Sequence, residues 1–459
     1  LPPIDDVFGG IDPYADDEEA MASPPPETEP LEPAGVDSGP TPIGSDGPGV
    51  PHADPADHGY LLLGPSGPSD RGADSPAGNG TLSGPPAAPP PPPSSLLGGP
   101  GGDNGSAPDA GPPPFDVAEA TTFIEPWAMT FLPDGRALVT EKRGPIKLWR
   151  EGQPAQPVTG GPQPVYGGQG GMGDVILHPD FANNRLVYLS WVEAGQGGKG
   201  AAVGRAKLVE DLAGARLEGL QVIWRQEPKV SGNGHFGHRL AFGPDGMLYI
   251  SSGERQKFEP AQNPDANLGK IVRLTDAGMI PSDNPWYDQG RLRAQIWSLG
   301  HRNPLGIAFD AAGRLWEIEM GPSGGDEVNL VVRSANYGWP RASNGTHYDG
   351  RDIPDHKPGD GYQPPKVWWN PSISPGSLMI YSGEAFPAWQ GDAFIGALGG
   401  EALIRVDLDG EKAVKADQWP MQNRIREVEQ GPDGAIWLLE DSEDGETGRL
   451  LKLTPHTRK

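Results

Sequence analysis

The sequence predicts an all-β protein: a six-bladed β-propeller preceded by a long disordered, acidic, Pro/Gly-rich segment. Three observations lead to this prediction. A hairpin pattern of alternating apolar residues recurs along most of the chain, no long segment carries the helical period, and the composition changes abruptly near Phe115. We therefore divide the chain into residues 1–114 and a propeller domain at residues 115–459.

The first of these two parts is strongly acidic. Residues 1–114 hold 18 Asp and Glu residues and one basic residue, Arg71, which gives a net charge of −17 and leaves −26 + 17 = −9 for the other 345 residues. The same segment holds 28 of the 55 prolines and no tryptophan. Such a composition cannot bury enough apolar surface to offset the entropy of ordering, so we expect disorder with some polyproline character. A proline-rich tail that binds a partner is the functional alternative.

The hairpin pattern fills the second part. Each copy is an alternating apolar strand, a turn such as Pro-Asp-Gly, and a second alternating strand, and the turn residues supply the positive φ angles that a tight hairpin needs. The clear copies are residues 127–149, 173–192, 238–254, 305–321 and 425–441, and a looser copy is residues 392–410. Hairpins that recur over roughly 40–70 residues indicate a propeller whose blades are four-stranded sheets. Six copies predict six blades.

Bulk properties exclude several classes of function. A net charge of −26 argues against nucleic-acid binding, and the absence of cysteine excludes disulfides, iron–sulfur clusters and cysteine-ligated zinc. No apolar run is long enough to span a membrane. Gly168, Gly170 and Gly173 match the dinucleotide fingerprint G-x-G-x-x-G, but a strand-like run follows them where the fingerprint requires a helix. We therefore reject a nicotinamide site.

Polar residues gather on the connections between the hairpins. The stretch "GHFGHR" contains His235 and His238, a pair that could bind a metal, transfer protons or pack; the flanking glycines and the lack of a helix argue against a metal pair. Residues 319–340 offer carboxylates and bare carbonyls that suit a hard cation such as calcium. Arg424 and Arg426 lie two residues apart on one strand face, which suits either a multiply anionic ligand or a solvated surface.

From about Phe115 onward, the chain resembles the pyrroloquinoline quinone (PQQ)-dependent aldose sugar and soluble glucose dehydrogenases. The stretches "GQGGMGDVILHPDF", "HFGHRLAFGPDG", "LGKIVRL", "GHRNPLGIAF", "GPSGGDEVN", "NYGWP" and "NRIREV" occur in the family's order. The resemblance implies a six-bladed propeller that uses PQQ and Ca²⁺. It also implies an aldose substrate oxidised at C1 to the lactone, an external electron acceptor, and a periplasmic or secreted location.

The resemblance also implies roles for individual residues. His235 matches the catalytic base and Arg302 a donor at the reactive edge of the quinone, whereas His238 falls where relatives usually have a small residue, so we expect it to pack. The implied contacts to PQQ or its cavity are Gln169, Arg302, Asn303, Tyr348, Trp369, Arg424 and Arg426. The implied calcium ligands, or carbonyls near calcium, are Gly321, Pro322, Glu327 and Tyr337.

Two positions depart from the family pattern. Gly399 lies at or beside the position where relatives carry a lysine that contacts PQQ, and Leu305 stands where glutamine is common. Because propellers host many functions, two alternatives stay open. One is a propeller that binds a ligand or a protein without redox activity, and the other is a calcium-dependent lactonase-type hydrolase.

Overall fold

The computed structural model describes residues 111–456 of the chain. Two units are distinguished, Leu1–Pro91 and Pro92–Lys459, and the described residues all belong to the second. The predicted disorder of residues 1–114 therefore falls almost entirely outside the described residues. Every long element from 111 to 456 is a β-strand, which confirms the all-β prediction. No helix in this part of the chain is both long and apolar enough to cross a membrane.

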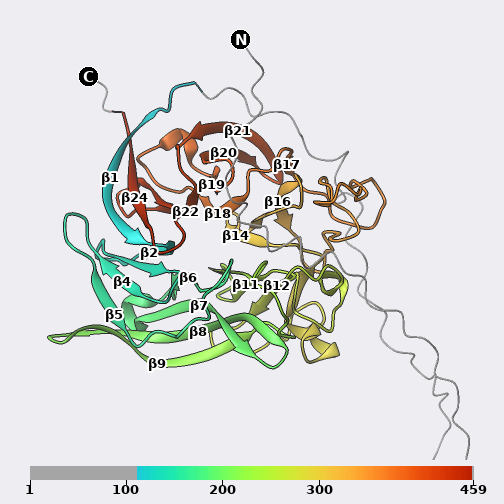
Figure 1. Ribbon diagram of the computed structural model, residues 1–459, viewed down its shortest axis with the longest axis horizontal. Helices are drawn as coiled ribbons and strands as arrows, with labels where there is room; N and C mark the ends of the chain where they lie inside the picture. The colour runs from blue at the N-terminus through green and yellow to red at the C-terminus, as the bar shows by residue number, and fades with distance from the viewer. Residues whose placement is uncertain (1–110, 457–459) are drawn as a thin grey trace, which may run out of the picture. The chain divides into compact units, whose positions relative to one another are not determined.

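The strands fall into groups of four that pair antiparallel with their neighbours (Figure 1). The first two groups are β2 (Pro126–Phe131), β3 (Ala137–Glu141), β4 (Ile146–Trp149) and β5 (Gln156–Thr159), then β6 (Met172–Leu177), β7 (Leu186–Gly195), β8 (Gly198–Asp211) and β9 (Gly214–Arg225). These two groups form one eight-stranded sheet, because β5 pairs in parallel with β9.

Four further sheets of four strands complete the described part of the chain. The next two groups are β10 (Gly237–Phe242), β11 (Leu248–Ser252), β12 (Lys270–Leu274) and β13 (Ile296–Leu299), then β14 (Pro304–Phe309), β15 (Leu315–Glu319), β16 (Asp326–Val331) and β17 (Val367–Trp369). The last two are β18 (Pro375–Ile380), β19 (Ala393–Ala397), β20 (Ala402–Asp409) and β21 (Lys412–Pro420), then β22 (Ile425–Gln430), β23 (Ile436–Glu440), β24 (Thr447–Pro455) and β1 (Phe115–Ile124). The helices are short and lie in connections: α2 (Phe181–Asn184), η1 (Glu259–Gln262), η2 (Tyr287–Gln289), η3 (Arg293–Gln295) and η4 (Pro387–Trp389).

The first strands of the groups form a closed ring. Strands β2, β6, β10, β14, β18 and β22 each contact the next in this order, and β22 contacts β2. The ring encloses a cavity of about 100 Å³ that residues of all six strands line. Each of these strands is most buried at its start, so the connections that precede them meet at one end of the ring.

A β-bulge recurs near the start of every ring strand. The register against the second strand shifts at Pro126/Ala128, Met172/Val175, Gly237/Leu240, Pro304/Gly306, Pro375/Ser377 and Ile425/Glu427. A bulge leaves a residue out of the ladder and re-aims its side chain. His238, Arg239 and Arg426 are such residues, and their bulges free their side chains from the regular alternation of the strand.

Five of the six predicted hairpins are confirmed as the first and second strands of a group. The sixth, residues 392–410, is also confirmed as a hairpin, but it joins the second and third strands of its group, β19 and β20. The first strand of that group, β18, is followed by a long connection that contains η4 and lacks a Pro-Asp-Gly turn. Without this turn signal, the sequence pattern begins one strand late.

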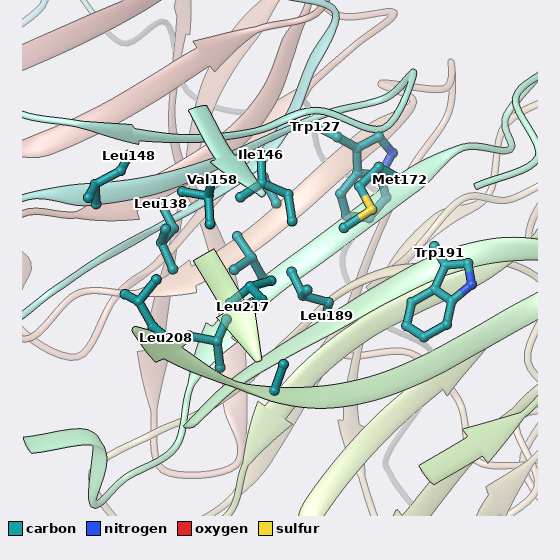
Figure 2. Close-up of a cluster of buried hydrophobic side chains, with 14 of the residues drawn as sticks. Trp127, Leu138, Ile146, Leu148, Val158, Met172, Leu189, Trp191, Leu208 and Leu217 are labelled. Carbon is teal, nitrogen blue, oxygen red and sulfur yellow. The ribbon is translucent and has the colours of Figure 1, made fainter. Parts of the chain in front are cut away.

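Apolar side chains fill the spaces between the sheets. The cluster between the first two groups is drawn in Figure 2, and its labelled members are Trp127, Leu138, Ile146, Leu148, Val158, Met172, Leu189, Trp191, Leu208 and Leu217. Each fully buried side chain of this kind contributes roughly 1.5–3 kcal/mol of transfer free energy. The clusters hold the ring strands in place and thereby fix the connections at their ends.

Candidate active site

The candidate site lies at the end of the ring where the first strands begin. Gln169 precedes β6, His235 precedes β10, and Arg302 and Asn303 precede β14. Because neighbouring strands run antiparallel, each second strand ends where its first strand begins. Glu254, which follows β11, therefore reaches the same end.

His235 is held by backbone and side-chain contacts. Its φ of 49° lies in the left-handed region, which non-glycine residues seldom adopt and which often marks functional sites. Its backbone N–H donates to Gln169 Oε1 at 2.8 Å, and its Nδ1 contacts Glu254 Oε1 at 2.5 Å. The backbone N–H groups of Lys257 and Phe258 donate to the other oxygen of Glu254. With Nδ1 held by the carboxylate, the second ring nitrogen, Nε2, is the one left to accept a proton.

Electrostatics keep His235 neutral. Burial, followed by the positive charge of Arg302, lowers the pKa of His235 to about 4, while Glu254 acts in the opposite direction. Burial tends to raise the pKa of Glu254, but the hydrogen bond from His235, the charge of Arg302 and the backbone N–H of Phe258 together outweigh it, and the net pKa is lowered. At neutral pH the pair is thus an uncharged imidazole oriented by an ionised carboxylate, which is the arrangement of a general base.

His238 lies in a different environment. Its ring stacks on Trp127 at a centroid distance of 5.0 Å, and its Nδ1 contacts Ser190 Oγ at 2.7 Å. Burial, followed by the charge of Arg239, lowers its pKa to about 3. These contacts agree with the packing role expected for His238.

Arg302 and Asn303 present buried polar atoms without partners. Arg302 donates through one terminal nitrogen to the carbonyls of Met320 and Gly321, yet its Nε has no hydrogen-bond partner among the described residues. Asn303 is fully buried, and neither its Oδ1 nor its Nδ2 is bonded within the described part of the chain. Gly253 lies between Asn303 and the His235 segment. If Gly253 carried a Cβ, this atom would lie 3.0 Å from Asn303 Oδ1 and 2.1 Å from the backbone oxygen of His235, so the side-chain amide of Asn303 is close to the His235 segment. Unbonded buried polar groups are rare, and a ligand is one explanation for them.

The structure places the two aromatic residues predicted for the site, Tyr348 and Trp369, in different environments. Tyr348 is 42% exposed, and its hydroxyl accepts a hydrogen bond from Arg302 at 3.3 Å. Trp369 belongs to the apolar core of the fourth and fifth groups, with the Lys415 ammonium 5.0 Å from its ring centroid. No described contact joins Trp369 to His235 or Arg302. The structure thus brings Tyr348 to the site and gives Trp369 a packing environment.

A cluster of carboxylates lies behind Arg302. Glu319 accepts the backbone N–H groups of Arg302 and Asn303. Glu317 is fully buried, and neither of its oxygens has a hydrogen-bond partner in the described residues. Burial, followed by Glu319, raises the pKa of Glu317 to about 7. Burial opposes a charge on His301, but Glu317 and Glu319 raise its pKa to about 9. His301 is therefore positively charged at neutral pH, and its Nδ1 lies 3.6 Å from Glu317 Oε1 and 3.8 Å from Glu319 Oε1, so it offsets part of the negative charge of the cluster.

Glu327 and Tyr337 adjoin this cluster. They line a cavity of about 10 Å³ together with Arg302, Glu319, Met320, Gly321, Gly325, Trp339, Ala342 and Ser343. A cavity of this size holds about one water molecule or ion. Burial, followed by Glu319, raises the pKa of Glu327 well above its usual value. Pro322, the remaining predicted residue, is buried next to Gly321. Carboxylate oxygens crowded around a small cavity fit a hard divalent cation.

Arg424 and Arg426 meet at one carboxylate. The Nε of each donates to a different oxygen of Asp441, both at 2.9 Å. Burial tends to raise the pKa of Asp441, but the charges of Arg426 and Arg424 outweigh it and lower the pKa. Asp441 thus holds the two guanidinium groups side by side, a pairing of cations that suits an anionic ligand.

Sequence reasoning missed several residues of this site, namely Glu254, His301, Glu317, Glu319 and Asp441. Glu254 and Asp441 share a signal that could have revealed them. Each comes one or two residues after the second strand of a hairpin, at the end of the ring where the first strand begins. Glu317 and Glu319 lie two apart on β15, where alternation directs both side chains to one face.

Fold and site together define an all-β protein in which a buried, neutral histidine lies close to cationic and amide donors. The sequence model of the Glucose / Sorbosone dehydrogenase family matches residues 123–452. The chain therefore belongs to the glucose/sorbosone dehydrogenase family, which confirms the predicted resemblance. Among its relatives is the aldose sugar dehydrogenase YliI of Escherichia coli (strain K12), 41% identical over 74% of this chain and 94% of its own length.

Solved structures agree with this assignment. The apo-form of the soluble aldose sugar dehydrogenase of Escherichia coli matches with a TM-score of 0.71 and 38% identity, over 74% of this chain and all of its own. The PQQ-bound form of the aldose sugar dehydrogenase of Streptomyces coelicolor matches with a TM-score of 0.60 and 27% identity, over 75% of this chain and 99% of its own.

Proposed function

We propose that this protein is a PQQ- and calcium-dependent dehydrogenase that oxidises aldose sugars at C1 to the lactone and passes the electrons to an external acceptor. The observation that carries the proposal is the neutral, buried His235, oriented by Glu254 next to the unbonded polar atoms of Arg302 and Asn303. The aldose sugar dehydrogenases among the relatives support the substrate class. The PQQ-bound form of the Streptomyces enzyme supports the cofactor.

The proposal includes the finer architecture. We infer that the six groups of four strands are the blades of a β-propeller and that the ring of first strands surrounds its axis. In that arrangement, connections from distant parts of the sequence converge at one end of the axis. Such convergence accounts for a site built from residues as far apart as Gln169 and Arg426.

The chemistry of the donors fits PQQ, a planar quinone that carries three carboxylates. Arg424 and Arg426 are suited to bind its carboxylates, because Asp441 holds their guanidinium groups side by side. Arg302 Nε and the amide of Asn303 are unbonded donors for the quinone oxygens. When bound, PQQ supplies the two-electron acceptor that takes the hydride from C1 of the sugar.

His235 performs the proton transfer in this reaction. Its Nε2 accepts the proton of the C1 hydroxyl while Glu254 holds Nδ1–H and stabilises the imidazolium that forms. Arg302 lies close enough to lower the pKa of His235 and to donate toward negative charge that develops on an oxygen beside it. Tyr348, half exposed above Arg302, borders the opening through which the sugar enters.

Calcium would bind at the carboxylates behind Arg302. Glu327 and Glu319 are the ligands that the small cavity offers, and Glu317 adds two unbonded oxygens close to them. A bound cation would offset the repulsion among these carboxylates and thereby fix Glu319, which holds the backbone of Arg302 and Asn303. We also propose a periplasmic or secreted location, which fractionation of the producing cells would test.

The test is a titration followed by an assay. Metal-free protein is titrated with PQQ in the presence and absence of calcium, with the absorbance of PQQ as the readout. The reconstituted protein is then assayed for dye reduction with several aldoses and with a lactone as the alternative substrate. We expect saturable PQQ binding and aldose-dependent dye reduction. Lactone hydrolysis without dye reduction would favour the lactonase-type hydrolase, and no PQQ binding would favour the non-redox binding protein.

A further inference from the structure

Lys142 is a buried cation without a partner among the described residues. It follows β3 in the connection to β4, and only 9% of the residue is exposed. No carboxylate, carbonyl or other acceptor in the range 111–456 forms a hydrogen bond or ion pair with its ammonium group. Its Nζ lies 5.7 Å from the centroid of the Tyr166 ring, and the carboxylates of Asp441, Glu443 and Glu125 are within electrostatic reach. Nζ is not one of the fully buried unbonded atoms of the described residues, so the ammonium keeps access to solvent while the rest of the side chain is buried. Holding a cation without a direct partner at such a position costs free energy that an anionic ligand would recover.

The register of the sheets locates Lys142 at the active-site end. Lys142 directly follows Glu141, which pairs with the first residue of β2. Asp441 directly follows Glu440, which pairs with the first residue of β22, so the two residues occupy the same place in their groups. These groups are neighbours, because β2 contacts β22. Lys142 thus lies beside the group that carries Arg424 and Arg426.

Two observations tie Lys142 to the site itself. Burial, followed by the positive charge of Arg426, lowers the pKa of Lys142, so the two cations lie within electrostatic reach of each other. Its backbone carbonyl accepts the N–H of Met172, and a Cβ on Gly171 would lie 2.8 Å from its Cγ. Lys142 therefore packs on the segment that carries Gln169, between that segment and the arginine pair.

The place of Lys142 can be compared with that of Gly399, the position at or beside which relatives carry a lysine. Leu398 directly follows Ala397, which pairs with the first residue of β18, and Gly399 comes next. Gly399 and Lys142 therefore occupy corresponding connections in two different groups, on either side of the group that carries the arginine pair. Gly399 is exposed and contributes no side chain at this place.

We propose that Lys142 binds a carboxylate of PQQ together with Arg424 and Arg426 and supplies the positive charge that is absent at Gly399. This inference rests on the proposed function. It adds a third cation to the anion site beside Arg424, Arg426 and the carboxylate of Asp441, with Glu443 and Glu125 also within electrostatic reach of Lys142. A charge-assisted hydrogen bond in such a setting is typically worth about tenfold to a hundredfold in affinity.

The experiment measures PQQ binding by three proteins: the wild type, Lys142→Met and Lys147→Met. The last is the matched control, because Lys147 lies on β4 close in sequence, is more exposed and pairs with Glu141 at 3.5 Å. We expect the dissociation constant of PQQ to rise about tenfold to a hundredfold for Lys142→Met and to stay within about twofold for the control. Without PQQ, Lys142→Met should melt at or above the temperature of the wild type, because the substitution removes an unpaired buried charge.

Each outcome is decisive. Equal affinity of Lys142→Met and Lys147→Met would overturn the inference while leaving the proposed function intact. A large loss of melting temperature in PQQ-free Lys142→Met and in a second variant, Lys142→Gln, would overturn it as well, because the lysine would then be structural. If the wild type itself binds no PQQ, the proposed function fails, and this inference fails with it.

Discussion

Two arginines at the centre of the molecule are equally buried, at 4% exposure each, and differ in their partners. Arg239 stacks on Trp127 at 4.1 Å, pairs with Glu427, and donates to the carbonyls of Leu305 and Gly376. Arg302 has no carboxylate partner in the described structure, and its Nε is unbonded. Arg239 lies within the ring, and Arg302 lies at its end.

The difference separates a structural cation from a functional one. The hydrogen bonds of Arg239 reach three ring strands or the residues in their bulges, so this residue ties the ring together. Arg302 is fixed through its backbone and through two carbonyls, and it still has a donor to offer. Burial and charge alone do not distinguish the two residues. They differ because Arg302 keeps a hydrogen-bond donor without a partner among the described residues.

The histidine pair repeats this contrast and gives the largest expected effect. His235→Ala should lower kcat by about 10²–10⁴-fold with PQQ still bound, whereas His238→Ala should lower it far less, because only His235 is oriented as a base. With a pKa of about 4, neutral His235 should keep kcat/KM on its plateau well below pH 6.5, with a decline toward pH 4. Steady-state dye reduction across pH measures both. Equal activity of His235→Ala and wild type would contradict the mechanism.

The two arginines should respond to the same substitution in opposite ways. Arg239→Met leaves Glu427 and the buried carbonyls of Leu305 and Gly376 without their hydrogen-bond donor, so we expect a loss of about 3–5 kcal/mol in the free energy of unfolding. Arg302→Met should cost less stability and lower kcat by about 10²–10³-fold through lost charge stabilisation. Denaturant unfolding and saturating kinetics on both variants provide the measurements. Reversed results would break the distinction between structural and functional arginine.

Removal of calcium should have a moderate effect. A cation present at 100 times its dissociation constant stabilises the folded protein by about 2.7 kcal/mol, so a chelator should lower the melting temperature of the wild type. Glu327→Gln should blunt this response. Glu259→Gln is the control, because its side chain is 74% exposed and makes only a surface ion pair. An unchanged melting temperature after verified metal removal would exclude the proposed site.

The smallest effect concerns the pH dependence of stability. Burial, opposed by Arg239, raises the pKa of Glu427 to about 8 from an ordinary value of 4.5. The folded state then holds a proton that the unfolded state releases, so this contribution is fully present below pH 4.5 and is lost as the pH rises through 8. The melting temperature of the wild type should therefore fall more between pH 6 and pH 9 than that of Glu427→Gln. Identical slopes would mean that Glu427 is ionised inside the ring.

Local signals make much of the fold predictable from sequence. Pro-Asp-Gly turns between alternating strands identify hairpins because both the turn and the strand leave residue patterns of short range. The hairpin at residues 392–410 falls one strand later in its group than the other five, because the connection after β18 carries no such turn. The parallel pairing of β5 with β9 has no local signal at all, since it joins residues far apart in the chain.

The site is only partly predictable for the same reason. The family motifs identify His235, Arg302 and Arg426, but not Glu254 or Lys142, whose roles depend on which connection lies next to which. Trp369 is the opposite case, because the family motifs place it in the site and the structure packs it in the apolar core. Its position beside other aromatic residues in the sequence does not reveal which face of β17 it occupies. Contacts between residues of different strand groups decide the roles of these residues, and such contacts are fixed only when the ring closes.

The closing pair, β1 and β24, has a consequence for how the protein is made. Residues Phe115 and Pro455 pair across nearly the full described length, so β1, the first of the described strands to be synthesised, pairs with the last of them, β24 (Figure 1). Until β24 has left the ribosome, β1 keeps an open edge, and open edges are the parts of a sheet most prone to pair with another molecule.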